Sequence, residues 1–111
     1  MSITYEDFKK VEIRAGKILS AEKIEGSEKL LKLSVDFNEE SPRQIVSGIR
    51  KYFPDESMLV GKTTLFVSNL EPRSLMGLES NGMLFAMGNG DTAPFSLFHP
   101  QEGTPPGTLA S

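Results

Sequence analysis

Hydrophobic and polar residues alternate along four segments of the chain, which is the pattern of β-strands that bury one face and expose the other. In the first segment Val11, Ile13 and Ala15 alternate with charged residues, and Gly16 predicts a bulge or bend in that strand. The four predicted strands cover residues 11–19, 30–37, 43–49 and 63–68. This number of short strands predicts a fold built mainly from β-structure.

Capping signals predict two short helices. Thr4 precedes acidic residues that would lie in a first turn, so a helix is expected over residues 5–9. Between the third and fourth strands, residues 53–60 predict a second helix, because Pro54 suits the first helical position and Gly61 the end. The polar segments that are predicted to turn are residues 22–29 and 38–42.

The segment from Asn69 to Ala86 follows neither the helical nor the strand period. It contains a turn proline, a lone arginine, two glycines and a dense apolar end. We predict a loop that places Asn69, Arg73 and Ser80 near one surface, with Met83, Leu84 and Phe85 entering the core. Beyond it, Asn89-Gly90 predicts a two-residue turn. The segments that flank this turn are predicted strands at 83–87 and 95–98, and the proline-rich tail 99–111 is expected to be extended or irregular.

Five or six short strands with a helix between the third and fourth favour one architecture. The fold class predicted is all-β, a five-stranded Greek-key OB-fold barrel with short helices and an extended C-terminal segment. A β-sandwich is the alternative, although a chain of 111 residues with a long tail leaves few strands for two sheets. We find no repeat and no linker, so residues 1–111 are predicted to form a single domain.

The charges are distributed unevenly, although the net charge is only −3. All 12 Lys and Arg residues precede Ser74, and the last third of the chain carries only three acidic residues and one histidine. A charge-poor, apolar tail often packs against a partner, and in a small protein that partner can be a second copy of the chain. The modest net charge argues against indiscriminate binding of polyanions.

The sequence predicts no catalytic residue, no metal site and no cofactor. Cysteine is absent and His99 is the single histidine, which excludes thiol chemistry and nearly excludes a Ser-His system. Gly61-Lys62-Thr63 resembles the end of a phosphate-binding loop, but Glu56 stands where that loop needs its first glycine. The N-terminus lacks the apolar core of a signal peptide and no segment is long enough to span a membrane, so a cytoplasmic protein is expected.

The basic residues have two readings on composition alone. They are spread over the predicted strands and loops, as expected both for the solvated face of a barrel and for a surface that binds nucleic acid. Few aromatic residues are placed to stack on bases. From these residues alone, the sequence predicts a small β-barrel that could be a binding module. The basic residues weighed in this way are Arg14, Lys17, Lys29, Lys32, Arg43, Arg50 and Arg73.

Several ordered motifs resemble one family over nearly the whole chain. They are YEDFKKVEIRAGKI at the start, KLL followed by LSVDF, RQIVSGI, LVGKTTLFVSNL, NLEPRSLMGLESNGM and the closing PPGT. This order is similar to the small tRNA-binding domains that occur as free-standing proteins and as an appendage of some methionyl-tRNA synthetases. The resemblance implies an OB-fold that binds tRNA by its shape and does no catalysis. It also implies a homodimer in which residues 84–111 contribute to the interface.

The resemblance implies a shallow RNA-binding face. Its two cations would meet phosphates or stack on a base, its polar residues would hydrogen-bond ribose hydroxyls or base edges, and its methionine would supply an apolar floor. The residues implied are Lys29, Gln44, Ser47, Asn69, Arg73, Ser80 and Met83. The partners implied are tRNA and a second copy of the chain, with an aminoacyl-tRNA synthetase or an unfolded polypeptide as further candidates.

Four positions depart from the family pattern. Gly26 stands where the family has an asparagine, and basic residues of the family are replaced by Glu71, Ser74 and Met76. Because each lost phosphate contact weakens the salt-dependent part of the affinity, these changes favour weaker tRNA binding. They leave open an alternative function, in which the chain resembles the CsaA-type chaperones that bind unfolded or exported polypeptides.

Overall fold

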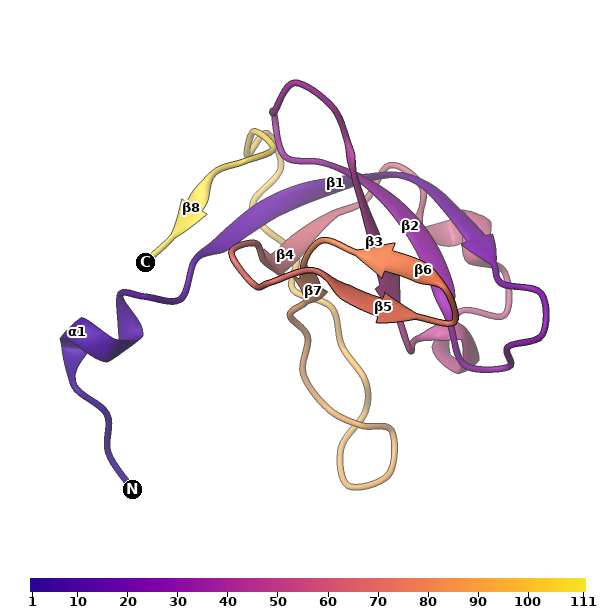
Figure 1. Ribbon diagram of the computed structural model, residues 1–111, viewed down its shortest axis with the longest axis horizontal. Helices are drawn as coiled ribbons and strands as arrows, with labels where there is room; N and C mark the ends of the chain where they lie inside the picture. Colours follow the sequence, from indigo (N-terminus) through magenta and orange to yellow (C-terminus); the bar gives the residue numbers. More distant parts are fainter.

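The computed structural model describes residues 1–111 as one barrel with an N-terminal helix that stands away from it (Figure 1). Helix α1 covers Tyr5–Phe8 and is closed by the predicted capping box, in which Thr4 accepts a hydrogen bond from the Asp7 amide. Two 3-10 helices, η1 (Arg50–Tyr52) and η2 (Glu56–Leu59), follow the third strand. The strands are β1 (Ile13–Lys23), β2 (Leu31–Asp36), β3 (Arg43–Ser47), β4 (Thr63–Val67), β5 (Arg73–Leu75), β6 (Leu78–Ser80), β7 (Met83–Leu84) and β8 (Leu109–Ala110).

The strand order confirms the predicted all-β barrel. The main sheet runs β3-β2-β1-β4-β7, with β8 paired to the start of β1. All pairs are antiparallel, and the long strand β1 contacts three others. The amide of Asn81 donates to the carbonyl of Gln44, 2.8 Å away, which nearly closes the barrel between β3 and the segment leading to β7. The sheet thus curls round a single core.

The core is filled by the inward residues of the alternating strands. At its centre Phe66 packs edge-on against Phe37, with 5.5 Å between the ring centroids. Leu59 of η2 is fully buried and plugs one end of the barrel. The ten buried residues of the core are Ile18, Leu31, Leu33, Val35, Phe37, Ile45, Ile49, Leu59, Phe66 and Leu97.

The bulge predicted at Gly16 is wrong in its position. The register of β1 against β2 shifts between Ile18 and Ser20, so the extra residue is Leu19. Gly16 is required for a different reason, because a Cβ there would lie 2.6 Å from a side-chain methyl of Val35 and 2.9 Å from Phe66. The strand therefore approaches the core too closely for any side chain at this position.

The helix predicted over residues 53–60 lies in the predicted place but differs in form. Pro54 does not start it. Instead, Asp55 caps the 3-10 helix η2 by accepting a hydrogen bond from the Ser57 amide at 3.1 Å. The segment is too short for an α-helix, because the extended conformation of Asp55 and the left-handed conformation of Gly61 bound it. The burial of Leu59 does not depend on the helix type.

Three predictions for residues 69–98 are wrong in detail. Residues 73–80 form a β-hairpin instead of a loop. Of the three residues expected in the core only Leu84 packs against it, whereas Met83 and Phe85 are exposed. Around Asn89-Gly90 there is no two-residue hairpin, because Asn89 accepts hydrogen bonds from two later amides and widens the loop. A single bridge, Met87 to Ser96, joins the flanking segments.

Candidate functional site

The β5–β6 hairpin lies along the edge of β3 that is not paired with β2 (Figure 1). Its turn is Met76-Gly77, both with positive φ (50° and 79°), which is the geometry that suits the twist of a tight hairpin. The hairpin is attached to β3 by side chains as well as by backbone. The Gln44 amide nitrogen donates to the carbonyl of Glu79 at 2.9 Å, and the Val46 amide donates to the Ser80 hydroxyl at 2.9 Å.

Ser80 therefore has a structural position. Its side chain is 2% exposed, and its hydroxyl accepts from Val46 and donates to the carbonyl of Gly82 at 3.0 Å. Both hydrogen-bonding functions of the hydroxyl are used inside the protein. Arg73 lies directly opposite Ser80 in the hairpin and is exposed. Ser80 thus holds β6 against β3, and Arg73 lies opposite it on β5 of the same hairpin.

Gln44 and the outer residues of the neighbouring strands form a shallow polar hollow of about 140 Å³. Gln44 pairs in register with Ser34, which in turn pairs with Ser20 on β1, so the three side chains share one face of the sheet. Of these three residues, only Gln44 was predicted from the sequence to belong to the site. The alternation of β2, which buries Leu33 and Val35, was the signal that would have added Ser34. The residues that line the hollow are Ser20, Lys32, Leu33, Ser34, Pro42, Arg43 and Gln44.

Lys29 and Ser47 lie near the opposite end of β3, where β2 begins and β3 ends. Ser47 pairs with Leu31 at the end of β3, and the carbonyl of Lys29 accepts a hydrogen bond from the Arg50 amide at 3.1 Å. The loop that carries Lys29 is held by Ser27, whose hydroxyl accepts from the amides of Lys29 and Leu30. The Lys29 side chain is exposed on this anchored loop.

The hairpin turn reaches the same loop. A Cβ built on Gly26 would lie 3.8 Å from the terminal methyl of Met76. Gly26 and Met76 are two of the four positions at which the chain departs from the family pattern, and the structure makes them neighbours. A sequence read one position at a time could not show that these two departures concern one spot on the surface.

Asn69 lies away from this group, whereas Met83 lies on β7, which packs beside β3. The Asn69 side chain accepts from the Glu12 amide at 2.8 Å and donates to the carbonyl of Lys10 at 2.7 Å, so it ties the chain entering β1 to the end of β4. Met83, on β7, pairs with Val67 of β4 and is 43% exposed. Six of the seven predicted residues thus lie on or beside β3 and the hairpin, and Asn69 does not.

Three of the seven basic residues weighed from the sequence are used inside the fold. The Arg14 guanidinium donates to the carbonyl of Gly107 at 2.8 Å, that of Arg43 to the carbonyl of Ser68 at 2.5 Å, and that of Arg50 to the carbonyl of Ser27. Lys32 forms an ion pair with Glu22 at 3.1 Å. The basic side chains of this set that have no ion pair or hydrogen bond in the protein are Lys17, Lys29 and Arg73.

Two ion pairs lie near the starts of β1 and β3. Glu12 lies 2.6 Å from Arg14, and Glu39 lies 2.7 Å from Arg43. The hydrogen bond from Arg14 holds the pKa of the Glu12 carboxyl below its ordinary value of 4.5, and a second from the Ser68 hydroxyl acts in the same direction. The hydrogen bond from Arg43 lowers the pKa of Glu39 in the same way.

These lowered pKa values predict that acid weakens the fold. A carboxyl with a lower pKa in the folded state stabilises the protein above its unfolded-state pKa, and this contribution disappears as the pH falls through the folded-state pKa. The free energy of unfolding in urea is therefore expected to fall as the pH drops below 4.5, the ordinary pKa of Glu39. Glu39→Gln should lower the free energy at about pH 7 and flatten its fall toward about pH 3.

Glu40→Gln is the matched control, because Glu40 is an exposed neighbour of Glu39 that takes no part in an ion pair. It should keep the pH profile of the unmodified protein. An equal flattening in both variants would show that general charge, and not the Glu39–Arg43 pair, sets the profile.

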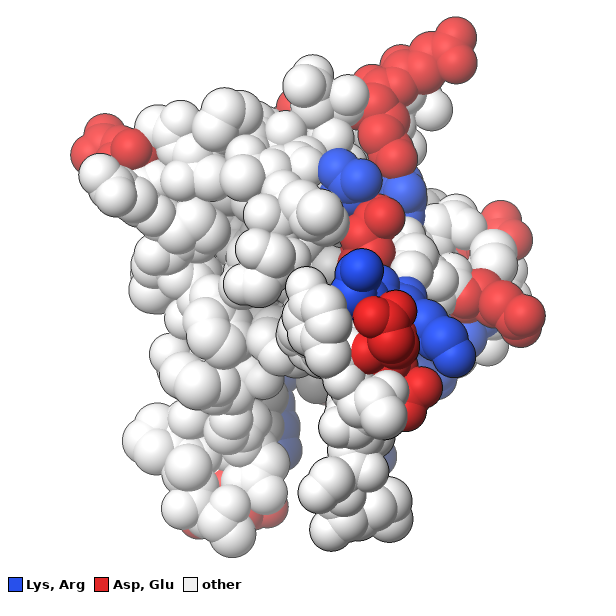
Figure 2. Space-filling view, turned by 90° about the vertical axis from the view of Figure 1, so that its left-hand side faces the viewer, with Lys and Arg blue, Asp and Glu red and all other residues white.

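The charged groups of the face with the chain termini form a mixed band. Figure 2 shows Lys and Arg lying among Asp and Glu there, with a broad uncharged surface beside them. No group of three or more His, Asp or Glu side chains comes together in a way that could hold a metal ion. No helix has the length and apolarity to cross a membrane. The arrangement offers polar and basic contacts on one face and apolar contacts on another.

Comparison with known proteins identifies relatives along nearly the entire chain. A family model described as "Putative tRNA binding domain" matches residues 13–109. Methionine–tRNA ligase of Methanocella arvoryzae is 47% identical over 106 residues, which is 96% of this chain and 15% of the ligase. That of Caldanaerobacter subterraneus subsp. tengcongensis is 55% identical over 87 residues, 78% of this chain and 13% of the ligase. The chain thus spans about 15% of the length of these relatives.

Solved structures share the fold over their whole length. A MetRS related protein from Pyrococcus horikoshii superimposes with a TM-score of 0.90 at 36% identity, covering 100% of this chain and 99% of the other. The chaperone CsaA from Bacillus anthracis str. Ames superimposes with a TM-score of 0.85 at 25% identity, covering 100% of both chains.

Proposed function

This chain belongs to the tRNA-binding domain family, and we propose that it binds tRNA through the face formed by β3, the β5–β6 hairpin and the loop that carries Lys29. The observation that supports this most is that two basic side chains without ion pairs are carried by backbone segments that hydrogen bonds hold in place. Lys29 and Arg73 are exposed and unpaired, and each stands on a segment that buried hydroxyls hold in place. Preorganised donors bind phosphate without the cost of ordering the protein first.

Each residue of this face has a distinct task in the proposal. Lys29 and Arg73 neutralise phosphates, whereas Gln44 and Ser47 hydrogen-bond ribose hydroxyls or base edges. Ser80 acts through Arg73 as a positioning residue, because its own hydroxyl is occupied. Asn69 contributes by fixing the start of β1, and Met83 offers an apolar contact at the rim. Recognition is non-covalent and depends on RNA shape, and the cytoplasm, where tRNA acts, is the proposed location.

The proposed complex is a homodimer that uses residues 84–111 together with α1. Helix α1 has no buried residue, and Tyr5 and Phe8 are 71% and 46% exposed. Between α1 and β8 lies a groove of about 280 Å³ that these two residues line with Val11 and Leu109. The helix buries no residue in its own subunit and lies beside the uncharged surface of Figure 2. A second copy of the chain would cover both.

A peptide-binding function is the second candidate. It rests on the likeness to the CsaA chaperone and on three apolar side chains, Met76, Met83 and Phe85, that are 58%, 43% and 36% exposed. Methionine side chains adapt to varied apolar partners, which suits binding of unfolded segments. A synthetase as partner is a further proposal, since the relatives that carry this domain are methionine–tRNA ligases.

The test is a filter-binding titration of purified protein with total tRNA at about 50 and 200 mM salt, with an unfolded polypeptide as competitor. Two phosphates neutralised by Lys29 and Arg73 predict that the fourfold rise in salt weakens binding about tenfold per face. The peptide should leave binding unchanged. Absence of tRNA binding together with peptide binding would contradict the proposal and favour the chaperone function.

A further inference from the structure

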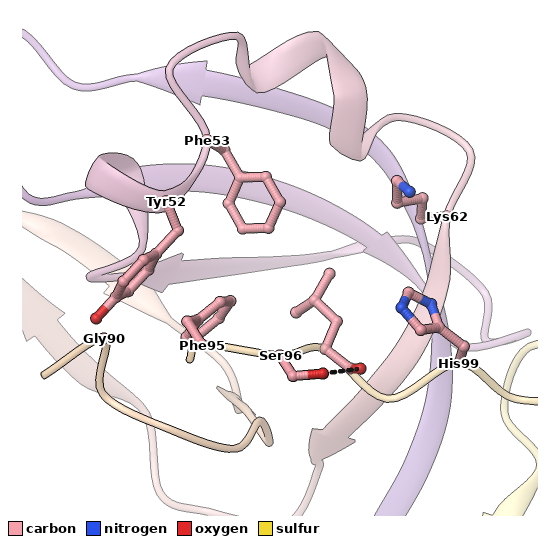
Figure 3. A pocket seen from close by; sticks show the side chains of 8 residues that line it. Tyr52, Phe53, Lys62, Gly90, Phe95, Ser96 and His99 are labelled. Atoms are coloured by element: carbon pink, nitrogen blue, oxygen red, sulfur yellow. Dashed lines mark hydrogen bonds between the residues drawn. The ribbon is translucent and has the colours of Figure 1, made fainter. Parts of the chain in front are cut away.

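A second cavity, of about 500 Å³, opens between η1, the start of β4 and the segment 90–99. Figure 3 shows three aromatic rings at one end of it, Tyr52, Phe53 and Phe95, and the side chains of Lys62 and His99 at the other. It shares no residue with the hairpin or with the outer face of β1, β2 and β3. It is therefore separate from the face proposed to bind tRNA. It uses part of the segment 84–111, but it shares no residue with the groove between α1 and β8 that is proposed for the dimer contact.

The aromatic end of the cavity is rigid. Tyr52 stacks on Phe95 with 4.2 Å between ring centroids and 5° between planes, and Phe53 meets Phe95 edge-on at 6.0 Å. The Tyr52 hydroxyl donates to the carbonyl of Asn89 at 2.5 Å, which fixes the ring against the loop. All three rings are only half-buried. The Tyr52 ring stacks on Phe95 and has the Lys51 ammonium 5.1 Å from its centroid, so the surface left for a further planar group is that of Phe53 and Phe95.

The other end of the cavity offers unpaired donors. Lys62 takes part in no ion pair, and neither its ammonium nor the His99 imidazole is hydrogen-bonded within the protein. No acidic side chain lines the cavity. Lys62 and His99 also border an adjoining hollow of about 220 Å³, formed with residues 100–104, and the acidic side chain of Glu102 lines that hollow. Because they share Lys62 and His99, the two spaces make one cleft, with the aromatic rings at one end, the two nitrogen donors in the middle and the loop that carries Glu102 at the other end.

We propose that this cleft binds a single nucleotide, with the base against the aromatic end and the phosphate at Lys62 and His99. Every base has a π-face that stacks on aromatic side chains, and an ammonium is a strong phosphate donor. The volume lies within the range of about 300–1,000 Å³ typical of small-molecule sites. A purely apolar ligand would leave both donors unpaired, and inorganic phosphate would leave the rings unused. The inference goes beyond the proposed function, because the cleft and the hairpin share no residue.

Binding is tested by titrating the protein with AMP, adenosine and ribose 5-phosphate, followed by ¹H-¹⁵N NMR and calorimetry. AMP should shift the amide signals of Gly90 and Ser96, which line the cavity, and should bind about tenfold more tightly than either half of the molecule. Lys62→Gln should weaken AMP binding about tenfold, and Phe95→Leu should reduce the preference for AMP over ribose 5-phosphate. Lys62 is exposed, so its replacement leaves the core intact even if Phe95→Leu fails to fold.

Lys17→Gln is the matched control, because it removes an exposed, unpaired lysine from the adjacent strand β1, outside both cavities. It should bind AMP like the unmodified protein. Equal weakening in Lys17→Gln and Lys62→Gln, or no shift of Gly90 and Ser96 with AMP, would overturn the proposal.

Two sources supply this ligand chemistry, a free mononucleotide and an unpaired nucleotide of an RNA chain. A single-stranded oligoadenylate distinguishes them. If it binds more tightly than AMP and Lys62→Gln weakens both, the cleft takes a nucleotide within RNA. If AMP binds and the oligomer does not compete with it, the cleft takes the free nucleotide. Arg73→Glu should leave AMP binding unchanged, so failure of the tRNA proposal would not count against this site.

Discussion

Arg73→Glu is expected to weaken tRNA binding about tenfold at low salt and to lower the slope of log affinity against log salt by about 1. Arg73 projects from β5 with no ion pair, so the change removes a phosphate contact and breaks no internal bond. Thermal unfolding should stay the same. The measurement is the same filter-binding titration, carried out at several salt concentrations with the unmodified protein beside it.

Two further variants separate the position from the charge. Lys17→Glu makes the same change of charge on β1, at an exposed residue outside the hairpin that has no ion pair, and should alter affinity far less. Ser74→Arg restores a basic residue next to Arg73 on the exposed hairpin and should strengthen binding. If Lys17→Glu and Arg73→Glu weaken binding equally, net charge governs affinity and the hairpin face is not the binding surface.

Gly107→Ala is expected to release the C-terminal tail from the barrel, lower the free energy of unfolding by about 2–4 kcal/mol and dissociate the proposed dimer. The Gly107 amide donates to the carbonyl of Ala15 at 2.7 Å, and Arg14 binds its carbonyl. Its φ is +88°, and a Cβ would lie 2.3 Å from the carbonyl oxygen of Phe37. The backbone cannot keep both bonds once a side chain is added.

Gly103→Ala controls for backbone strain alone. Gly103 also has a positive φ, +92°, but a Cβ there would meet nothing within 4 Å. It should cost about 1–2 kcal/mol and leave the tail attached. Urea unfolding measures the difference between the variants, and sedimentation velocity measures the mass of each. A Gly107→Ala protein that remains dimeric after losing the pairing of β8 with β1 would exclude the tail from the interface.

The barrel could be predicted because hydrophobic and polar residues alternate within each of its longer strands. The alternation in β2, with Leu33 and Val35 inward, fixes which face is buried before any partner strand is known. The β5–β6 hairpin could not be predicted this way. Its strands are three residues each, and its turn uses Met76 where asparagine or aspartate usually marks such a turn. Its attachment depends on Ser80 and Val46, which are 34 residues apart in the chain.

The candidate site could be predicted only in part, because the sequence does not show where a polar side chain points. Polar residues in a loop can face a ligand or satisfy the backbone, and both uses select the same residue types. Ser80 and Asn69 turned inward to backbone groups, whereas Arg73 and Lys29 stayed exposed. Gly16 shows the same ambiguity, since a glycine within a strand marks either a bulge or a close approach, and only the positions of Val35 and Phe66 decide between them.

The pairing of β8 with the first residues of β1 brings the two ends of the chain to one side of the barrel (Figure 1). Any neighbouring domain joined at either end would therefore emerge from the side that carries α1, and the hairpin would remain unobstructed. This geometry suits a domain joined to others at either end, and the matching segment makes up 15% of the ligase of Methanocella arvoryzae. The proposed dimer would use the same side, so a neighbouring domain and a second copy of the chain would compete for it.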